Sequence, residues 1–249
     1  MIERVFDALA HYARVCAGAS EGARALEREG VVAAVVPAVP ERSVVNSVIY
    51  RAADDLEAAY DDLAAAYDEI GAKWTVWVRP GDDRTAAFLQ GRGHVDDAQP
   101  VAMIHDLTGL ERPPAEALPD WTAEGDLAVV GPLNDRAYGL DTDSFTRALR
   151  SLPDVSRVYV ANDDGEPVGC LVMTDNDGNS DVEMVAVVPE ARGRGISGNL
   201  LLHALVDAAE RGCESSTLVA TKLGYPVYER VGFRPLGQIS MWERPRPDA

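Results

Sequence analysis

A glycine-rich segment between a predicted strand and a predicted helix constrains the fold of this chain more than any other feature. Its sequence is Val187-Val188-Pro189-Glu190-Ala191-Arg192-Gly193-Arg194-Gly195-Ile196-Ser197-Gly198. Glycines let a backbone turn with its N–H groups pointing inward, and the first turn of a helix adds N–H groups without partners in the helix. Such a junction binds anions. Because two arginines lie in the loop, the local charge is positive and we expect a diphosphate-bearing ligand.

An exposed Gly-Arg turn is the alternative interpretation of this loop. A strand precedes the loop, a helix follows it and both arginines belong to it, which together favour phosphate binding. The segment is not a P-loop, because no Gly-Lys-Ser/Thr follows it. It is not a dinucleotide fingerprint either, because it follows a hairpin meander rather than lying in a βαβ unit.

Two turn signals upstream of the loop predict that meander. Asn162-Asp163-Asp164-Gly165 and Asp175-Asn176-Asp177-Gly178-Asn179 separate three strand-like runs of apolar residues. The half of the chain from residue 121 onward is therefore predicted to follow the order β-α-β-β-β-α-β-α-β. Its predicted strands are 127–130, 155–161, 168–174, 182–188, 216–220 and 238–243, and its predicted helices are 144–152, 196–211 and 225–231.

Two motifs in this half resemble those of the GNAT superfamily of N-acetyltransferases. Arg192-Gly193-Arg194-Gly195-Ile196-Ser197, after Val187-x-Pro189, resembles the family's acetyl-CoA signature Arg/Gln-x-x-Gly-x-Gly/Ala. Tyr228-Glu229-Arg230-Val231-Gly232-Phe233 resembles its later Tyr-x-x-x-Gly-Phe motif. Ser197 departs from the usual Gly or Ala, but serine is small and can cap a helix or bind phosphate. The resemblance covers about residues 121 to 245 and implies an α/β (α+β) fold, with a twisted mixed β-sheet flanked by helices.

The resemblance also implies where acetyl-CoA binds. In this family the fourth and fifth strands, here 182–188 and 216–220, splay apart, and acetyl-CoA lies in the gap. The pyrophosphate would rest on the loop and helix start, and the pantetheine would pair with strand backbone, one of whose N–H groups would be the oxyanion donor. No metal is implied. The implied cofactor-binding residues are Val185, Ala186, Val187, Arg192, Gly193, Arg194, Gly195, Ile196, Ser197 and Gly198.

Acetyl transfer to an amine requires a group that takes the amine proton and a group that stabilises the departing thiolate. Tyr228 is the family's usual candidate for the second task. A phenol of pKa ~10 would protonate a thiolate whose acid has a pKa of ~8.5 uphill by about 2 kcal/mol, so hydrogen bonding in the transition state is easier than prior full transfer. Glu183 is the candidate base, acting directly or through water. The alternatives are a core aromatic for Tyr228 and a sheet-edge or hairpin carboxylate for Glu183.

Other polar groups give weaker signals. Asp141 and Asp143 lie between early elements that often line the acceptor pocket in this family, where they would hold a cationic substrate. Helix capping or solvation is the interpretation that we favour for both. The acidic turn after residue 174 lacks the spacing of an EF-hand, and the four histidines share no metal-ligand spacing.

The segment from Glu111 to Asp120 is the predicted domain boundary. Its prolines, Pro113, Pro114 and Pro119, can continue neither a helix nor a central strand. We therefore expect an N-terminal domain at 1–112, a linker at 113–120 and the catalytic GNAT domain at 121–249. In the N-terminal half, an opening helical pattern precedes predicted strands at 31–36, 43–50, 74–78 and 98–107 and predicted helices at 54–70 and 84–90.

A faint internal repeat relates the two halves. Phe88-Leu89-Gln90-Gly91-Arg92-Gly93-His94 can be laid on residues 227–233, which suggests a degenerate second domain of similar fold, as in tandem GNAT proteins; chance similarity is the alternative. Leu89 then stands in the place of Tyr228, and Pro37-Ala38-Val39-Pro40-Glu41-Arg42 in that of the glycine-rich loop. We expect this half neither to bind CoA nor to catalyse. It would pack against the active domain, shape the acceptor pocket or offer a dimer surface.

Composition limits the partners. With 23 Lys and Arg against 41 Asp and Glu, the formal charge is −18, which argues against nucleic acid and anionic lipid as partners. No basic leader precedes an apolar run and no stretch approaches the ~18 uncharged apolar residues of a membrane span, so a cytoplasmic protein is expected. Cys16, Cys170 and Cys213 have no Cys-x-x-Cys spacing and are expected to be small buried hydrophobes.

These observations predict an acetyl-CoA-dependent N-acetyltransferase that uses direct attack of a primary amine on the thioester. The acceptor would be an amine-bearing small molecule or peptide, and a homodimer is compatible with the sequence. The alternative function is a non-catalytic acetyl-CoA-binding or regulatory module. The presence of Tyr228 argues against this alternative. A hydrolase or ligase with a phosphate loop would need a metal or a nucleophile for which the sequence gives no signal.

Overall fold

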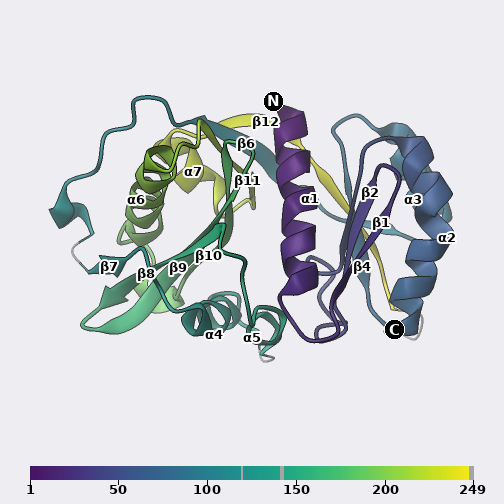
Figure 1. Ribbon diagram of the computed structural model, residues 1–249, viewed down its shortest axis with the longest axis horizontal. Coiled ribbons are helices and arrows are strands. Elements are labelled where there is room, and N and C mark those ends of the chain that lie inside the picture. The colour runs from purple at the N-terminus through teal and green to yellow at the C-terminus, as the bar shows by residue number, and fades with distance from the viewer. Residues whose placement is uncertain (119, 141–142, 247–249) are drawn as a thin grey trace. The chain divides into compact units, whose positions relative to one another are not determined.

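A computed structural model describes residues 1–118, 120–140 and 143–246. The chain divides into two compact units. The first contains Met1–Ala8 and Ala102–Leu236, and the second contains Leu9–Val101 and the chain from Gly237 onward. Each unit has one mixed, twisted β-sheet with helices beside it (Figure 1). This arrangement confirms the predicted α/β class. The first helix, α1 (Ile2–Gly18), contributes residues to both units.

The first unit contains a seven-stranded sheet in the order β12-β6-β11-β10-β9-β8-β7. Its strands are β6 (Val101–Asp106), β7 (Trp121–Thr122), β8 (Ser156–Asp163), β9 (Glu166–Asn176), β10 (Asn179–Val187), β11 (Ser215–Ala220) and β12 (Arg234–Gln238). Its helices are α4 (Leu127–Ala137), α5 (Ser144–Ala148), α6 (Ile196–Glu210) and α7 (Tyr225–Val231), with 3-10 turns η1 (Ala115–Ala117) and η2 (Pro189–Ala191).

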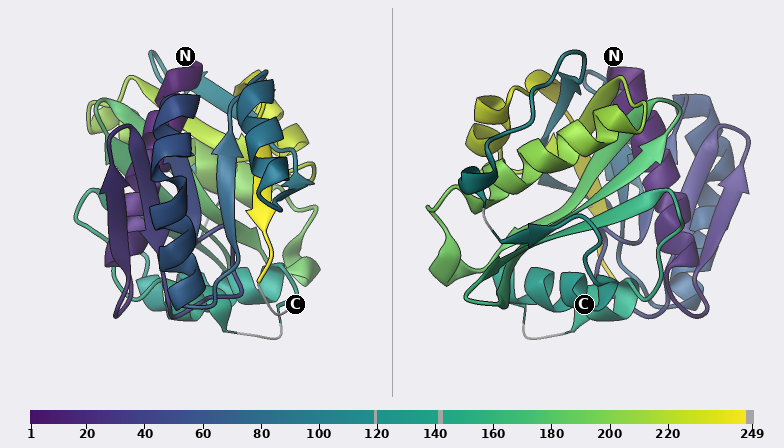
Figure 2. Two further views of the ribbon diagram at one scale, coloured as in Figure 1. Left: turned by 90° about the vertical axis from the view of Figure 1, so that its right-hand side faces the viewer. Right: turned by 60° about the vertical axis from the view of Figure 1, so that its left-hand side comes forward.

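Strands β8, β9 and β10 form the predicted antiparallel meander. In each of its turns an aspartate and the glycine after it both have positive φ. The angles are 50° and 82° at Asp164-Gly165, and 48° and 69° at Asp177-Gly178. Two successive left-handed residues give the backbone twist that joins neighbouring antiparallel strands. Helices α6 and α4 lie on opposite faces of this meander (Figure 2).

One predicted strand of this unit is wrong, because residues 127–130 form the first turn of α4. Asp126 caps the helix, and its Oδ1 accepts a hydrogen bond of 2.9 Å from the backbone N–H of Ala128. A side-chain oxygen in this position satisfies an N–H that has no partner inside the helix. The short apolar run after Asp126 suits a buried strand equally well, and the cap signal decides in favour of a helix.

The second unit contains a six-stranded sheet in the order β1-β2-β3-β4-β13-β5. Its strands are β1 (Arg24–Arg28), β2 (Val31–Val35), β3 (Ser47–Tyr50), β4 (Trp74–Val78), β5 (Val95–Ala98) and β13 (Ser240–Arg244), and its helices are α2 (Ala53–Glu69) and α3 (Asp83–Gly91). Alternate residues of β2, β3 and β4 pack with Leu56, Leu63 and Tyr67 of α2 in its hydrophobic core. Cys16 of this unit is buried, as are Cys170 and Cys213 of the first.

The end of the chain differs from the sequence-based expectation. Residues 238–243 were expected to be the last strand of the C-terminal half, but the chain forms β12 in one sheet and β13 in the other. Strand β13 pairs antiparallel with both β4 and β5, and Trp242 packs against the core around α2. The expected linker at 113–120 lies within the first unit, apart from Pro119, which is outside the described residues. Among the described residues, no helix combines the length and apolar character needed to cross a membrane.

Candidate active site

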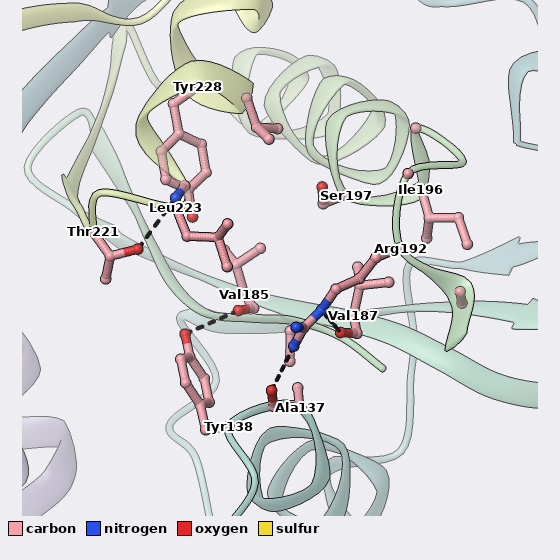
Figure 3. A pocket seen from close by; sticks show the side chains of 16 residues that line it. Ala137, Tyr138, Val185, Val187, Arg192, Ile196, Ser197, Thr221, Leu223 and Tyr228 are labelled. Atoms are coloured by element: carbon pink, nitrogen blue, oxygen red, sulfur yellow. Dashed lines mark hydrogen bonds between the residues drawn. The ribbon is translucent and has the colours of Figure 1, made fainter. Parts of the chain in front are cut away.

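A cavity of about 250 Å³ lies where β10 and β11 part (Figure 3). These parallel strands pair only at their first residues, from Asn179 opposite Ser215 to Asp181 opposite Thr217. The cavity walls come from β10, the glycine-rich loop, the first turn of α6, the segment after β11, α7 and the C-terminal end of α4. The predicted splaying of these two strands therefore produces a space that a ligand can enter.

The glycine-rich loop brings the N-terminus of α6 to this cavity. Gly193 and Gly195 both have φ of +78°, a left-handed conformation that glycine adopts without the strain of a Cβ. The first turn of α6 contains no acidic residue, and Ile196 and Ser197 line the cavity. Backbone N–H groups and the positive end of the helix dipole are thus available to an anionic ligand.

The two arginines of the loop have different surroundings. Arg192 lines the cavity, where its Nε donates to the carbonyl oxygen of Val187 at 3.1 Å and its Nη2 to that of Ala137 at 2.5 Å (Figure 3). Arg194 instead forms a two-pronged ion pair with Asp163, at 2.6 and 2.8 Å, and does not line the cavity. The positive charge at the cavity therefore comes from Arg192 and the helix end.

Tyr228 points its ring into the cavity from α7 (Figure 3). Burial raises the pKa of its phenol above the ordinary value, and the neighbouring Tyr138 adds to the rise. The hydroxyl therefore keeps its proton at neutral pH and is available as a hydrogen-bond donor. Gly224, at the start of α7, leaves room for the ring, because a Cβ there would lie 2.7 Å from Cε2 of Tyr228.

Tyr138 is a cavity residue that the sequence analysis did not identify. It directly follows α4, the residue is 55% exposed, and its hydroxyl donates to the carbonyl oxygen of Val185 at 3.4 Å (Figure 3). Its position could be predicted only from the end of α4, because it caps that helix. The prediction of residues 127–130 as a strand conceals this helix.

Glu183 is not among the described residues that line the cavity, and it is only 8% exposed. Its Oε2 accepts a hydrogen bond of 3.3 Å from Thr174, and Asp181, two residues earlier on β10, interacts with it. Asp181 in turn accepts a hydrogen bond of 2.7 Å from Thr217. Burial raises the pKa of both carboxyls, so the pair holds a proton where isolated carboxyls would have lost theirs.

The other candidate residues are distributed as follows. Of the ten predicted cofactor-binding residues, Arg194 and Gly198 do not line the cavity, and the other eight do. Asp143 precedes α5 and pairs with Arg147 at 2.8 Å, while Asp141 lies outside the described residues. Within the described ranges, no group of three or more His, Cys, Asp or Glu side chains is arranged to hold a metal ion.

Residues 154–235 match the family model described as the acetyltransferase (GNAT) domain. This stretch spans β8 to the first residues of β12 and includes every wall of the cavity except the end of α4. The chain carries a GNAT acetyltransferase domain. Members of this family transfer acetyl groups from acetyl-CoA. The match covers 82 of the 249 residues, so it describes the first unit and leaves the second unassigned.

Solved structures extend the fold similarity to nearly the whole chain. A GCN5-related N-acetyltransferase from Kribbella flavida has 17% identity and a TM-score of 0.63, with 95% of each chain covered. One from Sphaerobacter thermophilus has 20% identity and a TM-score of 0.57, covering 91% of this chain and 84% of that one. A tandem GNAT protein from the clavulanic acid biosynthesis pathway has 15% identity and a TM-score of 0.54, with 86% and 78% covered. The comparison with curated proteins gives no match.

Proposed function

We propose that this GNAT protein is an acetyl-CoA-dependent N-acetyltransferase that acetylates a primary amine of a small molecule or peptide. The observation that carries the proposal is the cavity between β10 and β11, which combines a helix N-terminus, a cation and a protonated phenol. An anion site alone would suit many phosphate ligands. The phenol at the same cavity supplies the donor that a departing thiolate requires.

The cavity residues fit the charged part of acetyl-CoA. Its diphosphate would be held by the N–H groups from Gly193 to Ser197, with Arg192 as the cation beside them. For this, the Arg192 side chain would exchange the neutral carbonyls of Val187 and Ala137 for charged phosphate oxygens. Because hydrogen bonds between ionised groups are stronger than those to neutral acceptors, the exchange is favourable.

In the reaction, the amine nitrogen forms a bond with the thioester carbonyl carbon and the bond between that carbon and sulfur breaks. The amine loses one proton and the CoA thiolate gains one, so the products are the N-acetyl amine and CoA. We assign to Tyr228 the hydrogen bond that stabilises the thiolate. Its raised pKa makes early proton transfer to sulfur still more uphill, which favours hydrogen bonding in the transition state with later transfer.

We assign the amine proton to Glu183. Because this carboxyl is buried and does not line the cavity, the transfer would pass through water rather than by direct contact. Asp181 belongs to the same acid pair, so a proton taken up by either carboxyl is shared between them. For the second unit we propose a degenerate GNAT-like domain that binds no CoA.

Thermal unfolding with and without saturating acetyl-CoA tests the proposal, with Arg192→Ala as the matched variant. A ligand at a hundred times its Kd stabilises the folded state by about 2.7 kcal/mol, which raises Tm by several degrees in a protein of this size. We expect this rise in the native protein and its loss in Arg192→Ala. No rise in the native protein would contradict the proposal. Once the rise is observed, the acceptor is sought by screening amines for CoA release.

A further inference from the structure

Asn134 is a buried polar residue in the middle of α4 for which the proposed function has no role. It is 1% exposed. Its Nδ2 lies 2.9 Å from the carbonyl oxygen of Val130, one turn earlier, and 3.2 Å from that of Met184 on β10. It also lies 3.5 Å from Sγ of Cys170 on β9. Helix α4 is thereby joined by hydrogen bonds to the strand that forms one wall of the cavity.

The contact with Met184 falls on a β-bulge. Glu183 pairs with Val172 and Ala186 with Cys170, so Met184 and Val185 together oppose a single residue of β9. Met184 has φ of +53°, a left-handed conformation that a non-glycine residue keeps only when its surroundings hold it there. The groups that hold its carbonyl oxygen are the Asn134 amide at 3.2 Å and the Cys170 thiol at 3.7 Å.

The direction of this carbonyl decides the direction of the next N–H. In a trans peptide the C=O and the following N–H point to opposite sides, and the chain contains no cis peptide bond within the described residues. Since the Met184 carbonyl points to Asn134 on α4, the N–H of Val185 points away from α4. Val185 lines the cavity, whereas the N–H of the next residue, Ala186, interacts with Cys170.

We propose that Asn134 is a positioning residue for acetyl transfer, which fixes the Met184 carbonyl in the bulge and so aims the Val185 N–H at the thioester carbonyl oxygen. This inference rests on the proposed function. Asn134 touches neither substrate nor the reacting atoms. It acts by keeping a strained peptide in one orientation before the substrate binds, which is how an oxyanion donor avoids reorganisation during the reaction.

An unsatisfied atom separates this role from ordinary packing. The side-chain oxygen of Asn134 is buried and has no hydrogen-bond partner among the described residues. A buried polar atom without a partner destabilises the fold, and an apolar residue would fill the same space without that cost. What an apolar residue lacks is the N–H that reaches Met184. The amide therefore contributes orientation at the bulge.

The test measures polarisation of the thioester carbonyl, which needs no acceptor amine. Acetyl-CoA labelled with ¹³C at the carbonyl is bound to the protein, and the C=O stretching frequency is compared with that of free acetyl-CoA. A hydrogen bond from the Val185 N–H lowers this frequency. The variants are Asn134→Ser and Asn134→Leu. Serine can still bond the carbonyl oxygen of Val130, one turn earlier, but is too short to reach Met184.

Asn46 provides the matched control, because it is fully buried in the second unit and also holds backbone groups. It bonds the carbonyl oxygens of Val39 and Arg42 at 3.0 and 3.2 Å and accepts from the N–H of Val36 at 2.8 Å. Because every polar atom of the Asn46 amide is bonded, Asn46→Leu should lower stability at least as much as Asn134→Leu does. It should leave the carbonyl frequency of bound acetyl-CoA unchanged.

The expected result is that both Asn134 variants bind acetyl-CoA but lose at least about half of the frequency shift, as expected when one oxyanion donor is misplaced. Adding Met184→Gly to Asn134→Ser should restore part of the shift, because glycine adopts positive φ without support from a neighbour. An unchanged shift in Asn134→Ser would overturn the inference. So would a native protein that binds acetyl-CoA without any shift, whereas a native protein that fails to bind it would overturn the proposed function as well.

Discussion

Two strand-to-helix junctions, β3–α2 and β10–α6, occupy the same place in their sheets but differ in chemistry. Each joins the first strand of a parallel pair to the helix that leads to the second strand. Between β3 and α2 there are two residues, Arg51 and Ala52, and Asp54 and Asp55 lie in the first turn of α2. Between β10 and α6 there are residues 188–195, and the first turn of α6 carries no acid. The second junction can receive an anion, whereas carboxylates already occupy the first.

The spaces beside the two junctions also differ, because one is filled by side chains and the other is a cavity. At the end of β3, Tyr50 is 1% exposed, and its hydroxyl donates to Asp82 at 2.6 Å while Arg79 donates to its carbonyl oxygen at 3.3 Å. Beyond β10 the corresponding space is the cavity lined by Arg192 and Tyr228. A parallel strand pair connected through a helix therefore does not by itself make an anion site. A long glycine-containing loop and an unfilled gap are also needed.

The largest effect is expected from Tyr228, which the internal repeat aligns with Leu89, a fully buried residue of α3. Tyr228→Phe should lower kcat by about 10²-fold or more, because it removes the donor to the thiolate. The Kd for acetyl-CoA should hardly change, because the anion site is untouched. Initial rates with an acceptor found by screening and calorimetric titration with acetyl-CoA measure the two quantities. Unchanged turnover would mean that Tyr228 only packs in the cavity and has no part in catalysis.

Copying the acid of α2 into α6 should abolish the difference between the junctions. Ser197 has the same place in its helix as Asp54 in α2, so Ser197→Asp puts a carboxylate where we expect the diphosphate. The Kd for acetyl-CoA should rise about 100-fold, since like charges brought together cost several kcal/mol. Stability should rise slightly, by about 0.3–1 kcal/mol, because an acid at a helix N-terminus is favourable.

Ser197→Asn is the neutral control for this change, and Asp54→Ser is the reverse substitution at the matching position of α2. Neither variant should change the affinity for acetyl-CoA by more than a few fold. If Ser197→Asp and Ser197→Asn weaken binding equally, steric crowding rather than charge is responsible. The charged part of acetyl-CoA would then not lie beside Ser197.

A smaller effect is expected from Gly224, which makes room for the Tyr228 ring. Gly224→Ala would place a Cβ 2.7 Å from that ring and displace the hydroxyl. We expect kcat to fall about tenfold, less than for loss of the hydroxyl, because the group is misplaced rather than removed. Gly198→Ala is the control, since its Cβ would meet Val227 and Val231 at an ordinary 3.8 Å. Equal rates in the two variants would contradict the assigned role of Gly224.

The smallest effect concerns stability and the acids of β10, which have no counterpart in the four residues of β3. Burial raises the pKa of Asp181 to about 7 and that of Glu183 well above its usual range. Below the usual carboxyl pKa of ~4 both folded and unfolded chains are protonated, and between there and pH 7 the folded chain binds more protons. The native protein should therefore lose stability as pH rises through this window.

The change should amount to about 1.4 kcal/mol per pH unit for each proton that only the folded chain binds. It is measured as the difference in urea-unfolding free energy between the native protein and the variant Asp181→Asn/Glu183→Gln from pH 5 to 8. A difference that does not depend on pH would mean that the pair is not protonated in the folded state.

Local signals were sufficient to predict the part of the site that lies on consecutive elements. Aspartate-glycine turns fixed the meander, and the Gly193 and Gly195 positions fixed the entry to α6, because both depend on backbone conformations that few residues adopt. Arg194 and Glu183 were harder, since their surroundings depend on tertiary structure. Arg194 pairs with Asp163 at the end of β8, and Glu183 is buried beside Thr174 of β9 and Asp181 of its own strand.

Pairing between distant segments explains the larger errors. The run after Asp126 is apolar enough for a strand, and its prediction as one concealed both Asn134 and Tyr138. The apolar residues Met241 and Trp242 do identify a strand at the end of the chain. They do not say which sheet the strand joins. In both sheets, the strand next to the parallel pair comes from a distant part of the chain.

The placement of β6 and β13 bears on how such a gene can change. A fragment that begins at residue 113 would encode the acetyltransferase motifs without β6, the strand beside β11, and would carry a β13 whose partners had been left behind. The N-terminal fragment would lack the strand between β4 and β5. If the two halves arose by duplication, neither can now be shed as a separate cassette. Each sheet contains a strand from the other half of the sequence, so the loss of either half would leave the remaining sheet incomplete.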